Sequence, residues 1–241
     1  MKPIQLIPVL GMPEIVRASD IAALICAAVA EANEQLAHQD VVVVTQKIVS
    51  KAEGAMAQVD PEDPLSHKPL VEQESVRILR RRGDLIISET KHGFVCANAG
   101  IDLSNVARGE AALLPVDPDR SARRIRDGIK GLTGIEVAVI ISDTFGRAWR
   151  RGVTDVAIGA AGILPVLDLR GTQDSYGREL QVTEVAIVDE IAGAAELVMG
   201  KSTGIPVAIV RGVEESAFQL GNARVGVMEN LIRSPQEDLF R

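Results

Sequence analysis

Three short runs of almost unbroken apolar residues constrain the fold more than any other feature of the chain. They read "VVVV" at 41–44, "VAVII" at 137–141 and "VAIV" at 207–210. Runs of this kind are typical of strands buried on both faces of a sheet. The first two end in polar residues, in "VVVVTQKIVSK" and "VAVIISDTFGR". Buried strands deliver their terminal residues to one edge of a sheet, where ligands commonly bind. The alternative is that these polar residues only mark the point where each strand ends.

Helical and strand segments of other kinds lie between these runs. Helices are predicted over residues 20–37 behind a Ser19/Asp20 cap, over "VEQESVRILRRRGD" ending at Gly83, over "DPDRSARRIRDGIKGLTG", and over "TEVAIVDEIAGAAELVMG" with Thr183 as cap and Gly200 as stop. A short strand is expected in "IQLIPVLGMPEI" and two more in "LIISETKHGFVCANAGID". Because strands and helices mix without a regular βαβ alternation, we expect the α+β class. We expect a single domain over residues 1–241, with a soft subdomain boundary near residues 115–118.

Composition and charge limit the kinds of partner that the protein is expected to bind. The 241 residues are 46% hydrophobic and 24% charged, as in an ordinary globular protein. A net charge of −7 and only 2% aromatic residues argue against nucleic-acid binding. Cys26 and Cys96 form no metal or redox pattern and are expected to be small core residues. No signal-peptide pattern and no membrane-spanning run is present in the sequence, so we expect a cytoplasmic protein without a membrane partner.

The stretch "ISDTFGRAWRRG" at 141–152 places an acid and a hydroxyl immediately before three arginines. A Mg²⁺ ion that holds nucleotide phosphates needs one or two carboxylates, often with a hydroxyl. Arginine side chains bind the remaining negative charge of phosphates or carboxylates. The combination is that of a phosphoryl-transfer site, while a solvated surface run of charges is the alternative. The relevant residues are Asp143, Thr144, Arg147, Arg150 and Arg151.

A polar loop, "NAGIDLSN", adds Asp102 and Asn105. These oxygen-bearing side chains could ligate a hard cation such as Mg²⁺ or Mn²⁺, or bond their own backbone in an Asx turn. Neither a GxxxxGK[ST] loop nor a GxGxxG motif after the first strand occurs in the sequence. "MGKSTG" at 199–204 lies at the end of a predicted helix and is interpreted as a C-cap followed by a turn. His92 is expected to be structural.

Several long stretches together resemble one family. They occur in the order "GMPEI", "TQKIVSKAEG", "HGFVCANAGIDLSN", "ISDTFGRAWRRGVTDVAIG" and "AIVDEIAGAAELVMGK". They resemble the coenzyme F(420)-0:γ-glutamyl ligase family over nearly the whole chain, down to the closing "DLFR". The stand-alone form, without the reductase domain that is fused to many bacterial relatives, is expected.

The resemblance implies a GTP-dependent ligase that joins L-glutamate to the deazaflavin coenzyme precursor through an acyl phosphate, with further γ-linked additions. It also implies a family-specific two-subdomain α+β fold, an intimate homodimer, two divalent cations (Mg²⁺ or Mn²⁺) and a monovalent cation such as K⁺. By position, the implied metal ligands are Asp102, Asp143 and Thr144. The implied GTP contacts are Met12, Pro13, Glu14, Ile15, Gln46, Lys51 and Asn105.

We further assign catalytic roles to four basic residues. Lys51 would meet the phosphates as a point charge, and the arginines at 147, 150 and 151 would orient the acceptor or glutamate. Three positions depart from the resemblance: Gln46 replaces a frequent Ser, Ala148 replaces a frequent Pro, and Lys201 stands where some relatives place a Gln near the second metal. A charged lysine cannot ligate a metal, so Lys201 is left out of the predicted metal set. The alternatives are a metal-dependent phosphohydrolase and a non-catalytic GTP- or coenzyme-binding module.

Overall fold

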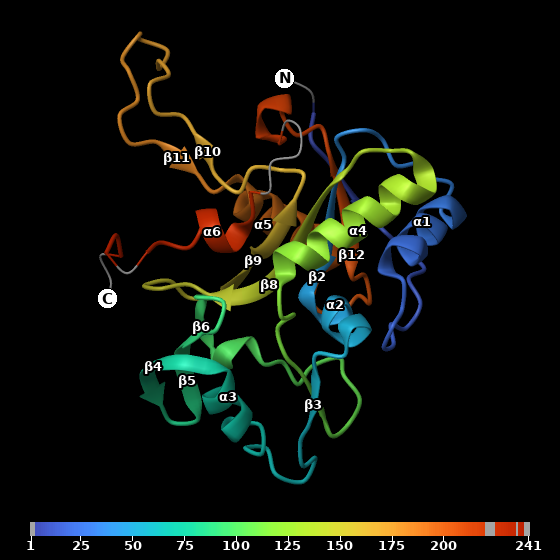
Figure 1. The fold of residues 1–241 in the computed structure, drawn as a ribbon, viewed down its shortest axis with the longest axis vertical. Coiled ribbons are helices and arrows are strands. Elements are labelled where there is room, and N and C mark those ends of the chain that lie inside the picture. Colours follow the sequence, from blue (N-terminus) through green and yellow to red (C-terminus); the bar gives the residue numbers. More distant parts are fainter. Residues whose placement is uncertain (1–2, 220–224, 235, 239–241) are drawn as a thin grey trace.

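The computed structural model describes residues 3–219, 225–234 and 236–238 and shows a mixed α and β protein (Figure 1). Its strands are β1 (Gln5–Pro8), β2 (Val41–Thr45), β3 (Met56–Gln58), β4 (Ser75–Arg82), β5 (Leu85–Thr90), β6 (Val95–Ala97), β7 (Glu110–Ala112), β8 (Ala138–Gly146), β9 (Val153–Ala161), β10 (Leu167–Asp168), β11 (Glu184–Val185) and β12 (Val207–Arg211). Its α-helices are α1 (Ile21–Glu31), α2 (Gln46–Glu53), α3 (Lys68–Glu74), α4 (Pro118–Thr133), α5 (Ile187–Met199) and α6 (Val227–Asn230). The predicted α+β character is confirmed.

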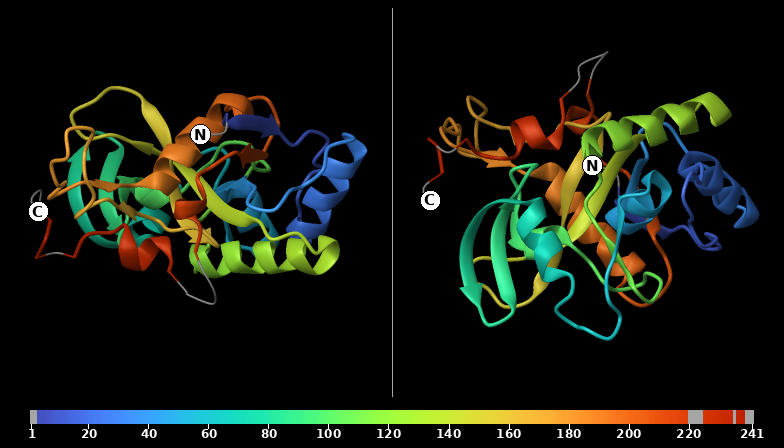
Figure 2. Two further views of the ribbon diagram at one scale, coloured as in Figure 1. Left: turned by 90° about the horizontal axis from the view of Figure 1, so that it is seen from above. Right: turned by 60° about the horizontal axis from the view of Figure 1, so that its bottom comes forward.

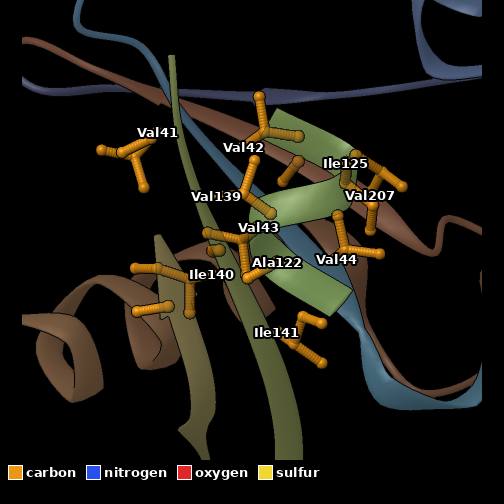
Figure 3. Close-up of a cluster of buried hydrophobic side chains, with 14 of the residues drawn as sticks. Val41, Val42, Val43, Val44, Ala122, Ile125, Val139, Ile140, Ile141 and Val207 are labelled. Carbon is orange, nitrogen blue, oxygen red and sulfur yellow. The ribbon is translucent and has the colours of Figure 1, made fainter. Parts of the chain in front are cut away.

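The central sheet contains all three apolar runs. Its strand order is β1-β12-β2-β8-β9, in which β2 and β8 are parallel and the other neighbouring pairs are antiparallel. All four valines of β2 are fully buried, as are the residues 138–141 of β8. The prediction of strands buried on both faces is therefore confirmed. Figure 3 shows the labelled side chains of β2 and β8 in one buried cluster with Ala122 and Ile125 of α4.

Helices cover both faces of this sheet. The amphipathic helix α4 packs on β8 and β9, whereas α5 packs on β9, β12 and β1. The left view of Figure 2 shows α4 and α5 on opposite sides of the strands. Helix α4 is capped by Asp117, whose side chain accepts from the backbone N–H of Arg120, and it ends at Gly134 with φ 74°. The parallel strands β2 and β8 therefore end at the same edge of a sheet that is covered by helices on both faces.

A smaller part of the fold surrounds the three-stranded sheet β4-β5-β6. It has its own buried cluster, which contains Val71, Ile86, Ala99, Ile101 and Ala111. Strands β3 and β7 pair with each other beside it. The predicted two-subdomain organisation, its boundary near residues 115–118 and the homodimer remain predictions.

One predicted helix is wrong over most of its length. In "VEQESVRILRRRGD" the helix α3 ends at Glu74, and residues 75–82 form β4. Gly83, with φ 56°, lies in the turn that joins β4 to β5, and Arg82 pairs with Leu85 across it. Backbone pairing with β5 therefore prevails over the apparent helical spacing. Intrinsic helix propensity is weak, and tertiary interactions commonly override it.

Other boundaries also differ from the expectation. Helix α1 ends at Glu31 instead of residue 37, and Asn33 beyond it has a left-handed φ of 55°. The cap of α5 is Ala186 and not Thr183, because the intervening residues form β11, which pairs with β10. Gly200 ends α5 as predicted. Helix α2 and strand β9 were not predicted.

Three remaining expectations concern the ends of the chain, the cysteines and membranes. Within the quoted "DLFR", residues 239–241 lie outside the described residues. Cys96 is buried, Cys26 is half-buried, and both are free thiols. Among the residues that the structure describes, no helix has the length and apolar character needed to cross a membrane.

Candidate active site

A cavity of about 420 Å³ opens at the carboxyl ends of β2 and β8. The parallel register pairs Thr45 with Ser142, so the polar residues that follow both apolar runs emerge at the same edge of the sheet. Every residue predicted to contact GTP or metal lines this cavity: Met12, Pro13, Glu14, Ile15, Gln46, Lys51, Asp102, Asn105, Asp143 and Thr144. The fold thus brings together residues from separate stretches of the chain.

Helix α2 supplies two lysines to the cavity. Lys47 and Lys51 are four residues apart, so they lie on one face of the helix. The Lys47 ammonium lies 2.8 Å from Asp102 Oδ2 and donates to Ser104 Oγ, while Lys51 pairs with Glu14. Gln46 is buried instead and donates to the Leu113 carbonyl oxygen at 2.7 Å. Gln46 therefore anchors the start of α2, although it also borders the cavity.

Asp102 lies in the polar loop after the 3-10 turn at 98–100. Its Oδ1 accepts a 2.7 Å hydrogen bond from the Ser104 backbone N–H, which is the Asx turn that the sequence left open. Its other oxygen faces the Lys47 ammonium. Burial raises the pKa of this carboxyl, but the hydrogen bonds from Lys47 and Ser104 outweigh it, so the pKa of Asp102 is lowered. Asp102 is therefore an ionised oxygen donor at the cavity wall.

Asp143 is the most perturbed acid at the site. Burial, with the charges of Asp102 and Asp155, raises its pKa from 3.8 to about 7, against the opposing hydrogen bond from the Thr144 backbone N–H at 2.8 Å. The carboxylate thus lies among other acids in an enclosed setting that disfavours its negative charge. A cation bound here would relieve that cost.

Thr144 belongs to a cluster that the sequence did not predict. Its hydroxyl donates to Asp155 Oδ1 at 2.8 Å and accepts from the Lys201 ammonium at 2.6 Å. Lys201 also lies 2.6 Å from Asp155 Oδ1 and 2.8 Å from Glu196 Oε1. Burial lowers the pKa of Lys201, but its bonds to Asp155 and Glu196 prevail and raise it. The antiparallel register of β8 and β9, which pairs Thr144 with Asp155, creates this cluster.

The fit to a divalent cation can be judged from these donors. Among the described residues, no group of three or more His, Cys, Asp and Glu side chains is placed to hold a metal ion. The predicted set contains two carboxylates and a hydroxyl, and the hydroxyl of Thr144 is already bonded to Lys201 and Asp155. Asp143, together with Asp102 if its pairing with Lys47 is released, could supply the one or two carboxylates that Mg²⁺ takes from protein when substrate phosphates and water complete its shell.

The three predicted catalytic arginines do not border the cavity. They lie at the exposed tip of the β8–β9 hairpin, where Arg147 Nη2 donates to the Arg151 carbonyl oxygen at 2.8 Å. Trp149 between them is 88% exposed and has a left-handed φ of 62°. The hairpin continues directly from Asp143 and Thr144, so the arginines extend from the site instead of forming its wall.

The structure also shows the surroundings of His92 and of the stretch at 199–204. His92 stacks on Phe94 and contacts the Pro115 carbonyl oxygen at 2.8 Å, so its environment is structural. The stretch "MGKSTG" does end α5 and begin a turn, but it also lines the cavity through Gly200, Lys201 and Ser202. The sequence interpretation missed this second property, because a helix end gives no sign of what lies opposite it.

Lysines, acids and a hydroxyl thus line one cavity at the edge of the central sheet, where ligand sites are common. A sequence model of the family described as F420-0:Gamma-glutamyl ligase matches residues 10–212. The chain therefore belongs to the F420-0:gamma-glutamyl ligase family.

Named relatives agree with this assignment over most of the chain. It is 45% identical to the "Coenzyme F420:L-glutamate ligase" of Methanothermobacter thermautotrophicus, over 99% of each chain. It is 43% identical to the protein of the same name from Methanopyrus kandleri, over 87% of this chain and 88% of the relative. The corresponding values for the Methanocaldococcus jannaschii protein are 44%, 84% and 84%.

Proposed function

We propose that the protein is a GTP-dependent ligase that joins L-glutamate to the deazaflavin coenzyme precursor F(420)-0. Family membership and relatives named as glutamate ligases support the glutamate-joining activity. The observation that carries the GTP dependence is the cavity, which gathers lysines, acids and the 12–15 segment at one sheet edge. A phosphorylated nucleotide needs both cationic side chains and a cation for its charge.

The proposed chemistry activates a carboxylate before the amide forms. A carboxylate oxygen of the acceptor attacks the γ-phosphorus of GTP, and the bond from that phosphorus to the bridging oxygen breaks as GDP leaves. The amine nitrogen of glutamate then attacks the acyl carbon, loses a proton, and expels inorganic phosphate. Further γ-linked glutamates would repeat these steps on the new carboxylate.

Several residues of the cavity suit individual steps of the proposed reaction. Lys51 lies on the cavity wall, where its charge would stabilise GTP phosphates. Asp102 and Asp143 would hold a divalent cation, Mg²⁺ or Mn²⁺, which supplies neutralisation of phosphate charge when bound. The hairpin arginines at 147, 150 and 151 would contact the acceptor or glutamate, which extend beyond the nucleotide. The second divalent cation, the K⁺ ion, the homodimer and the cytoplasmic location stay predictions.

A substitution that removes a charge without changing shape tests the assignment of Asp143. Asp143→Asn is expected to lower the rate of glutamylated product formation by roughly 10²–10³, the usual effect of one electrostatic transition-state contact. The matched control is Asp84→Asn, the same change at an exposed position outside the cavity, which should keep the parental rate. A near-parental rate for Asp143→Asn with Mg²⁺ or Mn²⁺ would show that this carboxylate has no role in the reaction.

A further inference from the structure

The ammonium group of Lys201 is surrounded by oxygen atoms at the edge of the cavity. It lies 2.6 Å from Thr144 Oγ1, 2.6 Å from Asp155 Oδ1 and 2.8 Å from Glu196 Oε1. Lys201 directly follows Gly200, which ends α5, and Glu196 belongs to the last turn of the same helix. The lysine therefore reaches from the helix end across to β8 and β9.

Asp155 explains why a positive charge is needed at this point. Its side chain is only 4% exposed, and its other oxygen accepts a 3.1 Å hydrogen bond from Ser142. A buried carboxylate is costly unless a cation is paired with it. Two acids and a hydroxyl that converge on one cation are also a donor set that a hard metal ion would take. In this chain the lysine already occupies the centre of that set.

A metal ion cannot enter the same set while Lys201 stays there. A divalent cation bound to Thr144 and Asp155 would stand within a few ångströms of the ammonium, and like charges at such a separation repel strongly in a partly buried site. Asp102 and Asp143 do not contact Lys201 in the described hydrogen bonds and ion pairs, and Asp102 is paired with Lys47 instead. Asp143 has no cationic partner among the described ion pairs, so a divalent cation can bind at this carboxylate once the Lys47 ammonium moves from Asp102 to the nucleotide phosphates.

We propose that Lys201 is a built-in cation that takes the place of one of the two divalent cations that the family resemblance implies. The chain then binds a single divalent cation, through Asp102 and Asp143, and Thr144 is a partner of Lys201 and not a metal ligand. This inference rests on the proposed function, because it assumes that the cavity binds a metal with a nucleotide. It corrects the count of cations and the set of ligands, not the reaction.

The number of bound metal ions tests the inference without measuring activity. The purified protein is titrated with Mn²⁺ in the presence of a non-hydrolysable GTP analogue, and bound Mn²⁺ is followed by electron paramagnetic resonance. The wild-type protein is expected to bind one Mn²⁺ per chain, with the uncoupled spectrum of an isolated ion. Lys201→Gln removes the charge and offers an oxygen ligand, so it is expected to bind a second Mn²⁺ and to show coupling between the two ions.

The control keeps the charge in place. Lys201→Arg should still bind one Mn²⁺, because a guanidinium remains beside the two acids. A second Mn²⁺ in the wild-type protein, or none gained in a folded Lys201→Gln variant, would overturn the inference and leave the ligase proposal intact. A wild-type protein that binds no Mn²⁺ even with the nucleotide analogue would instead overturn the proposed metal site, and this inference with it. The wild-type measurement decides the count even where the variant fails to fold.

Discussion

Replacing Asp143 by Asn should stabilise the metal-free protein while it impairs the site. The pKa of Asp143 is raised from 3.8 to about 7, chiefly by burial. Between these values the unfolded chain has ionised this group and the folded protein has not, so the folded state loses stability as pH rises from about 4 to about 7. Asn has nearly the same shape, keeps an oxygen that can accept from the Thr144 N–H, and never ionises.

The size of the effect follows from the shift. A difference of about three pKa units corresponds to roughly 4 kcal/mol at about 1.36 kcal/mol per unit. The carboxylate still faces the open cavity, and solvent screening reduces this value. We therefore expect the metal-free variant to have a free energy of unfolding about 1–3 kcal/mol above wild type at about pH 8. The gain should shrink as pH falls towards about 4.

Urea unfolding followed by far-ultraviolet circular dichroism, with a chelator present, measures this difference. Intrinsic fluorescence is a poor reporter, because Trp149 is 88% exposed. Asp84→Asn is the control and should change little at any pH. Addition of Mg²⁺ with a GTP analogue should stabilise the wild-type protein more than Asp143→Asn. A metal-free Asp143→Asn variant that is less stable than wild type at about pH 8 would refute the reasoning.

Three further substitutions and one labelling reaction probe the scaffold. Gly131→Ala should raise the free energy of unfolding by about 0.5–1 kcal/mol, because Gly131 lies inside α4 and an added Cβ meets nothing within 4 Å. Gly159→Ala should lower it by roughly 1–3 kcal/mol, because the Cβ would lie 2.4 Å from the Pro118 carbonyl carbon; equal urea midpoints for the two variants would contradict this packing. Asp119→Ala should cost roughly 3 kcal/mol or more, because this buried carboxylate accepts three backbone N–H bonds, and a change below about 1 kcal/mol would be inconsistent with them. Burial raises the pKa of Cys96 to about 12, so on the order of one molecule in ten thousand carries the thiolate at about pH 8, and iodoacetamide should label Cys96 quickly only after unfolding in urea; rapid labelling of the native protein would show the burial to be wrong.

The buried strands could be predicted because their sequences leave few alternatives. Runs such as 41–44 and 137–141 are apolar on both faces, and the structure buries them on both faces. Strand β4 could not be predicted, because "SVRILRRR" has spacing compatible with a helix and its strand form depends on pairing with β5, a non-local interaction. Strand β9 was missed because polar Thr154 and Asp155 lie near its start and because it contains Gly159, which must be small to pass Pro118.

Some residues of the candidate site could also be predicted from the sequence, and others could not. Asp143 and Thr144 stand out locally, because an acid and a hydroxyl follow an apolar run after a single serine. Their proximity to Asp102 depends on the fold around β8, and spacing in the sequence does not show it. Lys47 and Asp155 were missed because paired charges look like any other charged residues in a sequence, and only the structure shows their partners at 2.8 Å and 2.6 Å.

The most direct test of the proposed function is to count GDP and glutamylated product in the same reaction. The purified protein is given GTP, L-glutamate, Mg²⁺ or Mn²⁺ and the deazaflavin acceptor, and both products are measured by mass spectrometry and chromatography. We expect equal amounts of GDP and of new amide bonds, and neither product when glutamate or the acceptor is left out. GDP formed at the same rate without glutamate would instead indicate a phosphohydrolase, and amide formed without GTP would contradict the proposed use of the cavity.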